Sequence, residues 1–423
     1  MKRWLPVFLV PVITAAIALV LVADGQRASE SAVAETACPV SLQTLIDATP
    51  SGATLDVPGC VYRETVTVSR PMTINGAGAV IDGRDTSGRV VRAQWMRITA
   101  SDVTVRGITM RYANDDYSIA GLETAQTGVE RFRLEDCDVS GAFININLTG
   151  TTDSEVRNCA IHDARHLGIR VAAAAVGGGL RNRIVGNRIY HNDRVGEPDP
   201  NVDAGGLKAT NQVEVVIEGN VVHDNGGAGL WLDAACLDAT VRDNEVHHNE
   251  GAGIMDETST GTRIAGNAAW ANGFGPGGTW GWGAGILVSS SKGVDVYDNV
   301  IAWNNVGISV ISQDRPDSPG PTGTTVHDNV IVEEQPSATR DHFGLFWGQD
   351  WAGPMYLDAS GNRGSDNRYH YPGPEDRYWR FVWDGGRSTL TDFNSTPGEQ
   401  DGRYLSWSET AAILEAAGVP TAR

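Results

Sequence analysis

The feature that most constrains this chain is a short phrase that returns with a fixed internal spacing. A first Asn is followed five residues later by a second Asn, and a Gly-Ile or Gly-Leu pair then opens a strand-like stretch. The first Asn is Asn187, Asn220, Asn244, Asn267, Asn299 or Asn329, and the second is Asn192, Asn225, Asn249, Asn272 or Asn304. The closest copies, Asn220, Asn244 and Asn267, are 24 and 23 residues apart. Short strands at such a period predict a solenoid of parallel strands, in which each coil packs on its neighbours.

We therefore expect an all-β chain that folds as a right-handed parallel β-helix of about ten coils. The predicted divisions are a signal segment and linker over residues 1–34, an N-terminal cap over 35–65, the β-helix over 66–368, and a C-terminal capping segment over 369–423. The last segment should hold one helix, because Ser406 and Glu409 form a capping box and Gly418 provides a stop. The asparagine columns are expected to be structural, since stacked amides satisfy buried turns.

The N-terminus is basic at Lys2 and Arg3 and then apolar from Leu5 to Val22, which is typical of a secretory signal. Cleavage of this segment and its retention as a membrane anchor both stay open, because the run is long enough to span a bilayer. We expect a secreted protein, or a cell-surface protein if the segment is retained.

Five cysteines fit an exported protein. Cys38 and Cys60 bracket a short segment before the first coil and predict a disulfide. Cys137 and Cys159 should lie on adjacent coils, either bonded or merely stacked, and Cys236 is left over. The formal net charge of −19 argues against nucleic acid as a partner and against bulk attraction to anionic membranes. We expect a monomer.

Four segments are similar to those of a known group of proteins: Gly205-Gly206-Leu207-Lys208, Val222-His223-Asp224-Asn225, Gly229-Leu230-Trp231-Leu232-Asp233 and Trp282-Gly283-Ala284-Gly285-Ile286. Through them the chain resembles secreted right-handed parallel β-helix proteins of the pectate-lyase-like superfamily. The resemblance implies a polysaccharide as substrate or ligand. It does not specify the chemistry, because the superfamily contains lyases, hydrolases, epimerases and proteins without known activity. No calcium-binding Asp cluster is found, so the cofactor is unknown, and a divalent cation such as calcium stays open without a motif.

Strand alternation predicts which residues reach the outer face of the coils. Leu207, Leu230, Ile254 and Ile286 should point into the core. The next residues should form one outward column, consisting of Arg170, Lys208, Trp231, Met255 and Leu287. Two positions further on, a second column consists of Ala172, Thr210, Asp233, Glu257 and Ser289. This face combines two cations, an aromatic ring and two carboxylates on adjacent coils.

Two long insertions enter the same strand. In the coils of Asn225 and Asn249 the strand Gly follows the second Asn by four residues, but Gly206 follows Asn192 by 14 and Gly285 follows Asn272 by 13. The first insertion, 193–204, is acidic and contains Asp203, and the second, 273–284, contains Trp280 and Trp282. Both should rise at one edge and wall a groove for a few sugar rings. Trp231, Trp280 and Trp282 would be stacking surfaces, and Asp203 and Thr210 further substrate contacts.

A second cluster recurs three or four residues after the first Asn: His162, His191, His223, His247 and His248. We expect these side chains to stack on another, solvent-facing side of the coils, and we favour that interpretation over a metal site.

Three functions fit the predicted groove. In the favoured one, an acidic glycan is cleaved by β-elimination, with Lys208 or Arg170 as the base and the other cation on the uronate carboxylate. In the second, Asp233 and Glu257 hydrolyse a glycosidic bond. In the third, the groove binds a glycan without catalysis. Asp233 and Glu257 could also be ordinary surface carboxylates paired with Lys208, and Trp280 and Trp282 could simply pack their loop against the coils.

Overall fold

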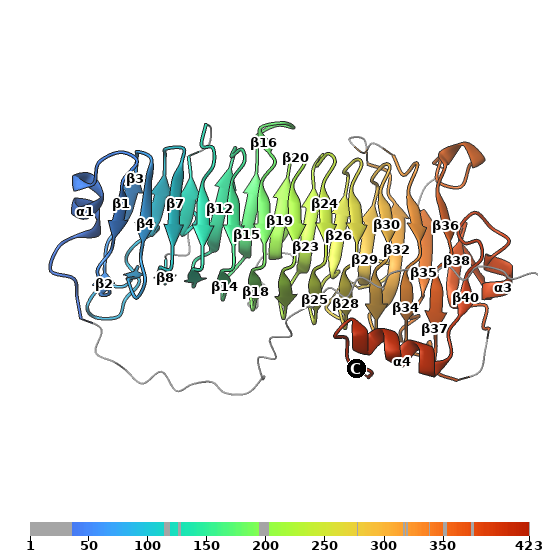
Figure 1. Ribbon diagram of the computed structural model, residues 1–423. Coiled ribbons are helices and arrows are strands. Elements are labelled where there is room, and N and C mark those ends of the chain that lie inside the picture. The colour runs from blue at the N-terminus through green and yellow to red at the C-terminus, as the bar shows by residue number, and fades with distance from the viewer. Residues whose placement is uncertain are drawn as a thin grey trace, which may run out of the picture. The chain divides into compact units, whose positions relative to one another are not determined.

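Three sheets run side by side along the stack of coils, because each repeat contributes one short strand to each sheet (Figure 1). Their strands are parallel, except that residues 386–388 pair antiparallel with residues 381–383 at the end of the third sheet. The computed structural model describes residues 36–113, 119–125, 128–193, 203–276, 278–315, 318, 320–337, 339–349, 353–373 and 376–422. The expected signal segment over 1–34 lies outside the described residues. In the described part of the chain, no helix has the length and apolar character needed to cross a membrane.

Within each sheet the strands pair in the following order along the coils. Sheet A contains β2 (Val61–Tyr62), β5 (Val80–Asp82), β8 (Thr109–Arg111), β11 (Asp138–Ser140), β14 (Ala160–His162), β18 (Arg188–Tyr190), β22 (Val221–His223), β25 (Glu245–His247), β28 (Ala268–Trp270), β31 (Val300–Ala302), β34 (Val330–Val332), β37 (Arg368–His370) and β40 (Arg403–Tyr404). Sheet B contains β1 (Thr54–Asp56), β4 (Met72–Asn75), β7 (Val103–Arg106), β10 (Arg133–Glu135), β13 (Glu155–Arg157), β17 (Arg183–Val185), β21 (Val216–Glu218), β24 (Thr240–Arg242), β27 (Arg263–Ala265), β30 (Asp295–Tyr297), β33 (Thr325–His327) and β36 (Arg363–Ser365). Sheet C contains β3 (Val66–Val68), β6 (Met96–Ile98), β9 (Leu122–Thr124), β12 (Ile144–Thr149), β15 (Leu167–Ala172), β19 (Gly205–Thr210), β23 (Ala228–Asp233), β26 (Ile254–Glu257), β29 (Ala284–Ser289), β32 (Val306–Ser312), β35 (Leu345–Gln349), β38 (Phe381–Trp383) and β39 (Gly386–Ser388). A small ribbon pairs β16 (Gly179–Leu180) with β20 (Gln212–Val213).

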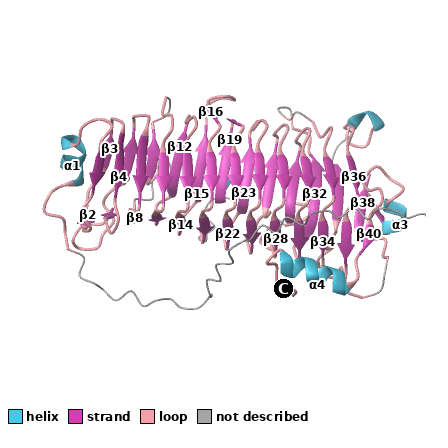
Figure 2. Ribbon diagram, viewed as in Figure 1, coloured by secondary structure: helices cyan, strands magenta, loops and turns pink. Residues whose placement is uncertain are grey.

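Helices lie outside the sheets (Figure 2). The described helices are α1 (Leu42–Ala48), α3 (Leu390–Phe393) and α4 (Trp407–Ala416), with a 3₁₀ turn at Asp358–Ser360. The predicted capping box is confirmed at α4, where Ser406 and Glu409 satisfy each other's backbone N–H groups. Helix α4 runs along the C-terminal end of sheet A (Figure 1).

Two asparagine ladders hold the coils in register. In the first, the amide of each Asn donates to the side-chain oxygen of the next across 2.9–3.0 Å. This ladder extends beyond Asn329 to Asn367 and ends on the carboxyl of Glu399. The second ladder links Asn192 to Asn304 in the same way. The predicted structural role of both columns is confirmed, since they satisfy buried backbone groups coil after coil.

The cysteine predictions are settled by the sulfur contacts. Cys38 and Cys60 form a disulfide, as predicted. Cys137 and Cys159 are free, buried thiols on adjacent coils, and the Cys137 N–H donates to Cys159 Sγ across 3.3 Å. They are therefore stacked and not bonded. Cys236 is also a free, buried thiol.

Three of the five predicted histidines, His162, His223 and His247, stand in a stacked column on sheet A, whereas His191 and His248 meet its rings edge-on. The rings of His162, Tyr190, His223, His247 and Trp270 follow one another with centroid separations of 4.4–5.2 Å. Burial lowers the pKa of His247 to about 3, so this imidazole is neutral at neutral pH.

Candidate active site on sheet C

The outer face of sheet C carries the two predicted columns in the predicted register. Arg170 pairs with Lys208, Lys208 with Trp231, and Trp231 with Met255 and then Leu287 along the stack. In the second column, Thr210 pairs with Asp233, and Glu257 pairs with Ser289. The alternating residues Leu207, Leu230, Ile254 and Ile286 are buried in the core, as predicted. Strand alternation alone therefore positions the candidate residues.

The apolar half of this face is covered and not open. Trp231 is 2% exposed, and Met255 and Leu287 are also buried, in one apolar cluster that continues along the coils to Phe346. Pro276 and Trp282 of the second insertion border a narrow cavity together with Trp231 and Met255. The indole of Trp282 packs against the same cluster. The prediction that Trp231 offers an open stacking surface is therefore wrong for this arrangement. Trp282 packs its loop against the coils, which was the alternative to a sugar-binding role for this residue.

Lys208 lies at the boundary between the polar and the apolar half. Its Nζ is 3.1 Å from Asp233 Oδ2 and 3.4 Å from Asp203 Oδ1. The ammonium also lies 3.7 Å from the centre of the Trp231 ring, which is a favourable cation–π distance. An ammonium held in two ion pairs has no lone pair with which to accept a proton. The prediction of Lys208 as the base therefore does not fit this geometry.

Arg170 and Thr210 are the more accessible polar residues beside Lys208, and both are half-buried. The Nε of Arg170 donates to Asn147 Oδ1 across 3.2 Å, which aims the guanidinium along the face. Because arginine stays charged in proteins, Arg170 can bind an anion but cannot act as a base.

His166 is a candidate that the sequence reasoning missed. Its ring is fully buried, stacks on Phe143 at 5.0 Å and has Nε2 3.8 Å from Asp203 Oδ2. Burial, together with the positive charges of Arg170 and Lys208, lowers its pKa to about 4 against the opposing effect of Asp203. The imidazole is therefore neutral at neutral pH. The other histidines follow the first Asn of a coil by three or four residues. His166 does not have this spacing, so the repeat did not indicate it as a candidate.

Glu257 and Asp233 occupy neighbouring coils but have different surroundings. Glu257 is buried and forms an ion pair with Arg315, whereas Asp233 pairs with Lys208 and accepts a hydrogen bond from Thr258 Oγ1 across 3.3 Å. Burial, and then repulsion from Asp233, raises the pKa of Glu257 to about 7. At neutral pH Glu257 is thus protonated in a large fraction of molecules, next to a carboxylate that is ion-paired. The idea that Lys208 pairs with both carboxyls is wrong for Glu257, whose cation is Arg315.

Trp280 lies on the same side of the coils, several strands further along. Its indole is 41% exposed and contacts the Phe346 ring edge-on at 5.8 Å. It borders a cavity of about 470 Å³ that Thr279, Asn305 and Arg340 also line. The backbone of Trp280 has a φ of 48°, which is unfavourable for a bulky residue and marks a position held by its surroundings.

The first insertion is described only at its two ends, and the metal-binding capacity of the site can be judged from the described residues. Residues 194–202 of the first predicted loop lie outside the described residues, and Asp203 at its end contacts Lys208. Among the residues that the structure describes, no group of three or more His, Cys, Asp or Glu side chains is arranged to hold a metal ion. The described part of the site thus offers ion pairs and carboxyls, but no calcium ligand set.

Known proteins support the fold described above. Residues 181–339 match the family model described as a right handed beta helix region. A periplasmic alginate epimerase has a similar structure, with 12% identity, a TM-score of 0.52, and coverage of 86% of this chain and 83% of that chain. A lacto-N-biosidase from Eubacterium ramulus is similar at 13% identity and a TM-score of 0.50, with 76% and 62% covered.

The A-module of a mannuronan C-5 epimerase from Azotobacter vinelandii gives 13% identity and a TM-score of 0.48, with 74% of this chain and 93% of that chain covered. No protein of curated function matches the sequence. The predicted resemblance to right-handed parallel β-helix proteins is therefore confirmed at the level of fold.

Proposed function

We propose that this chain hydrolyses glycosidic bonds of a polysaccharide on the outer face of sheet C. Glu257 acts as the proton donor to the leaving oxygen, and Asp233 is the nucleophile. The observation that carries this proposal is the contrast between two neighbouring carboxyls. Glu257 has a pKa raised to about 7, while Asp233 is ion-paired with Lys208. A pair of carboxyls in such different environments is the usual signature of an acid and its partner.

The spacing of the coils supports the same roles. Adjacent parallel strands lie about 4.8 Å apart, so two outward carboxyls at equivalent positions can approach the roughly 5 to 5.5 Å of retaining glycosidases. In that mechanism Asp233 attacks the anomeric carbon while Glu257 protonates the leaving oxygen. Glu257, now ionised, then removes a proton from the water that releases the sugar. Hydrolysis also occurs on this fold, as the lacto-N-biosidase of similar structure indicates.

The test uses a panel of neutral and uronate-containing polysaccharides. We expect new reducing ends without ultraviolet absorbance from an unsaturated uronate, and we expect Glu257→Gln to abolish them. Glu218→Gln on sheet B is the matched control and should leave activity unchanged, since Glu218 lies on a different face. Full activity of Glu257→Gln would contradict the proposed role of Glu257.

A second function is favoured by His166. Its neutral imidazole lies behind Asp203, beside Arg170 and Lys208. This arrangement suits removal of the proton next to a uronate carboxylate, which is the first step of β-elimination. Arg170 would neutralise the substrate carboxylate, and the half-buried Asp203 would take the proton with His166 behind it. The C4–O4 bond then breaks, its electron pair leaves on O4, which takes a proton from solvent water, and a C4–C5 double bond forms. The similar structure of an alginate epimerase fits a uronate substrate.

The two functions give opposite results in one assay. Elimination produces ultraviolet absorbance that is lost in Asp203→Asn and retained in Glu257→Gln. Hydrolysis produces reducing ends without absorbance, and these are lost in Glu257→Gln and retained in Asp203→Asn. If neither product forms, but the polysaccharide still retards the protein, the groove binds without catalysis.

A further inference from the structure

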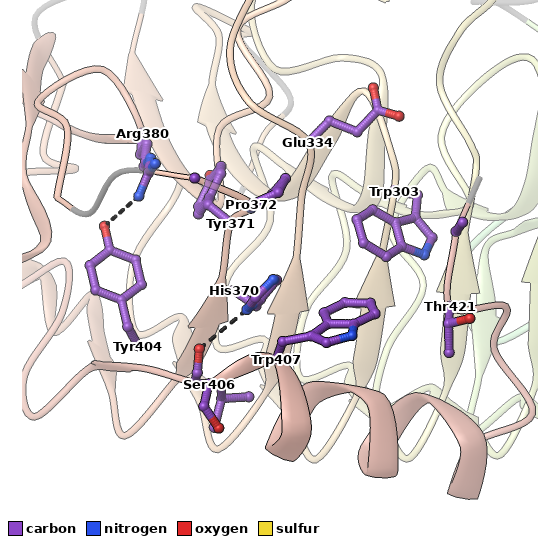
Figure 3. Close-up of a pocket in the computed structure, with 13 residues that line it drawn as sticks. Trp303, Glu334, His370, Tyr371, Pro372, Arg380, Tyr404, Ser406, Trp407 and Thr421 are labelled. Atoms are coloured by element: carbon purple, nitrogen blue, oxygen red, sulfur yellow. Dashed lines mark hydrogen bonds between the residues drawn. The ribbon is translucent and has the colours of Figure 1, made fainter.

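A cavity of about 950 Å³ lies between the C-terminal end of sheet A and helix α4 (Figure 3). Strand β37 and the segment at Tyr404–Trp407 form part of its wall, and the residues Thr421 and Ala422 close one side. Its volume is within the range of about 300–1,000 Å³ that is usual for small-molecule sites. None of the candidate catalytic residues borders it.

Two indoles and an imidazole give this cavity its flat apolar surfaces. Trp303 is almost fully buried, and its Nε1 donates to the Pro420 carbonyl across 2.9 Å, which fixes the ring. Trp407 begins helix α4 and is 47% exposed. Its ring centre is 5.2 Å from that of His370, and Figure 3 shows both indoles bordering the same space. Such surfaces bind the C–H face of a sugar ring.

Hydrogen-bond acceptors accompany these rings. His370 Nδ1 lies 3.2 Å from the Leu405 carbonyl oxygen. Because a carbonyl can only accept, Nδ1 carries the proton in the neutral ring, and Nε2 is left as an acceptor. Glu334 also lines the cavity, and its half-exposed carboxylate has Oε2 3.7 Å from His342 Nε2. Sugar hydroxyls are the natural donors to both groups.

The remaining wall is rigid. Arg380 is 1% exposed and lies over the Tyr371 ring at 4.2 Å. Its Nη1 donates to Tyr404 Oη across 3.2 Å, and Nη2 donates to Gln335 Oε1 across 3.2 Å. A wall held by such contacts is formed before a ligand arrives, which lowers the entropy cost of binding.

We propose that this cavity is a second carbohydrate site, and that it binds a short neutral oligosaccharide. The rings stack on the sugar, and His370 and Glu334 accept hydrogen bonds from its hydroxyls. The Glu334 carboxylate disfavours a uronate at this position, since like charges repel. The site is on sheet A, so it can hold one part of a glycan while sheet C acts on another. It does not depend on which reaction sheet C performs.

The test is isothermal titration calorimetry of the full chain with cellotetraose, xylotetraose and maltotetraose. A tetramer of galacturonate is the charged counter-probe. We expect at least one neutral tetramer to bind, and Trp407→Ala to weaken that binding at least tenfold. Glu334→Gln should weaken binding of the neutral sugar several-fold. Trp407 is half exposed at the start of α4, so its loss should leave the coils folded.

Two further variants separate this cavity from the groove. Tyr378→Ala removes another exposed aromatic ring and should leave binding unchanged. Trp280→Ala removes the exposed indole on the sheet C side and should also leave it unchanged. The proposal is overturned if no neutral tetramer binds, or if the uronate tetramer binds more tightly. It is also overturned if binding is lost in Trp280→Ala and kept in Trp407→Ala.

Discussion

Lys208 Nζ lies 3.1 Å from Asp233 Oδ2, and this ion pair crosses from β19 to β23 where the face of sheet C changes character. On the N-terminal side, the outward column continues through Arg170, Asn147 and Glu123. On the C-terminal side, it continues through buried apolar residues beginning with Trp231. The candidate site is therefore a polar surface that ends against an apolar wall, and Lys208 is the residue that joins them.

Replacing Lys208 tests how much this ion pair stabilises the fold. In Lys208→Met, two carboxylates lose their cation while remaining partly buried. Breaking a fully buried pair costs about 3–5 kcal/mol, but partial exposure of Asp203 and Asp233 screens this to about 1–3 kcal/mol. We expect a loss of that size in denaturant unfolding. Lys292→Met is the control, because Lys292 is exposed, and equal effects of the two substitutions would contradict the argument.

The pH dependence of catalysis should follow Glu257. If this side chain is the proton donor, kcat/KM falls as pH rises above about 7, where Glu257 loses its proton. The Arg315 charge opposes the upward pKa shift of Glu257, so Arg315→Met should raise that pKa further and move the alkaline limb to higher pH. Arg340→Met removes a cation near Trp280 and should leave the limb in place. A shift of the alkaline limb to lower pH in Arg315→Met would contradict the assignment of Glu257 as the proton donor.

Most of the fold and the register of the site could be predicted from the sequence, because both depend on local periodicity. The Asn-to-Asn spacing fixes the turns, and strand alternation then places Lys208 and Glu257 outward. The burial of Trp231 could not be predicted from strand alternation, because it depends on how the second insertion folds, and Pro276 and Trp282 of that insertion border a narrow cavity with Trp231. The partner of Glu257 was missed because Arg315 stands 58 residues away. His166 lay outside any repeated spacing.

A buried carboxyl inside the coils should make stability depend on pH. Asp256 is fully buried, accepts a hydrogen bond from Thr262 Oγ1 across 2.8 Å, and has its pKa raised to about 6 by burial. A carboxyl with a raised folded pKa favours the folded state at acid pH, and this advantage is lost between about pH 4 and pH 6. We expect Asp256→Asn to be more stable than the natural chain by on the order of 2 kcal/mol at pH 7. The two proteins should unfold alike near pH 4, and chemical denaturation at both pH values checks this.

The first asparagine ladder should be a main source of stability. Asn267 donates to the Val241 carbonyl and to Asn299 Oδ1, and its own Oδ1 accepts from the backbone and side chain of Asn244. Asn267→Ala leaves several of these buried groups without a partner, at about 1–3 kcal/mol each. We expect a loss of at least about 3 kcal/mol in the free energy of unfolding. Asn75→Ala, at a half-exposed position where the side chain donates to Asp56 and accepts from Arg106, should cost less than about 1 kcal/mol, because water can replace both partners.

Trp280 should matter for long substrates and not for short ones. It lies over Phe346 on β35, which is five coils beyond Lys208 on β19, or roughly 24 Å at about 4.8 Å per coil. One glycan can therefore contact Trp280 and Lys208 at the same time only if it is several sugar residues long. We expect Trp280→Ala to raise KM about tenfold for the polymer, since stacking on an aromatic ring is worth about 0.5–1.5 kcal/mol beyond the area it buries. The kcat should stay unchanged, and disaccharide and trisaccharide fragments should show the same KM in both proteins. An equal loss for fragments and polymer would instead mean that Trp280 only supports the folding of its loop, and Trp280→Phe should then fail to restore the polymer KM.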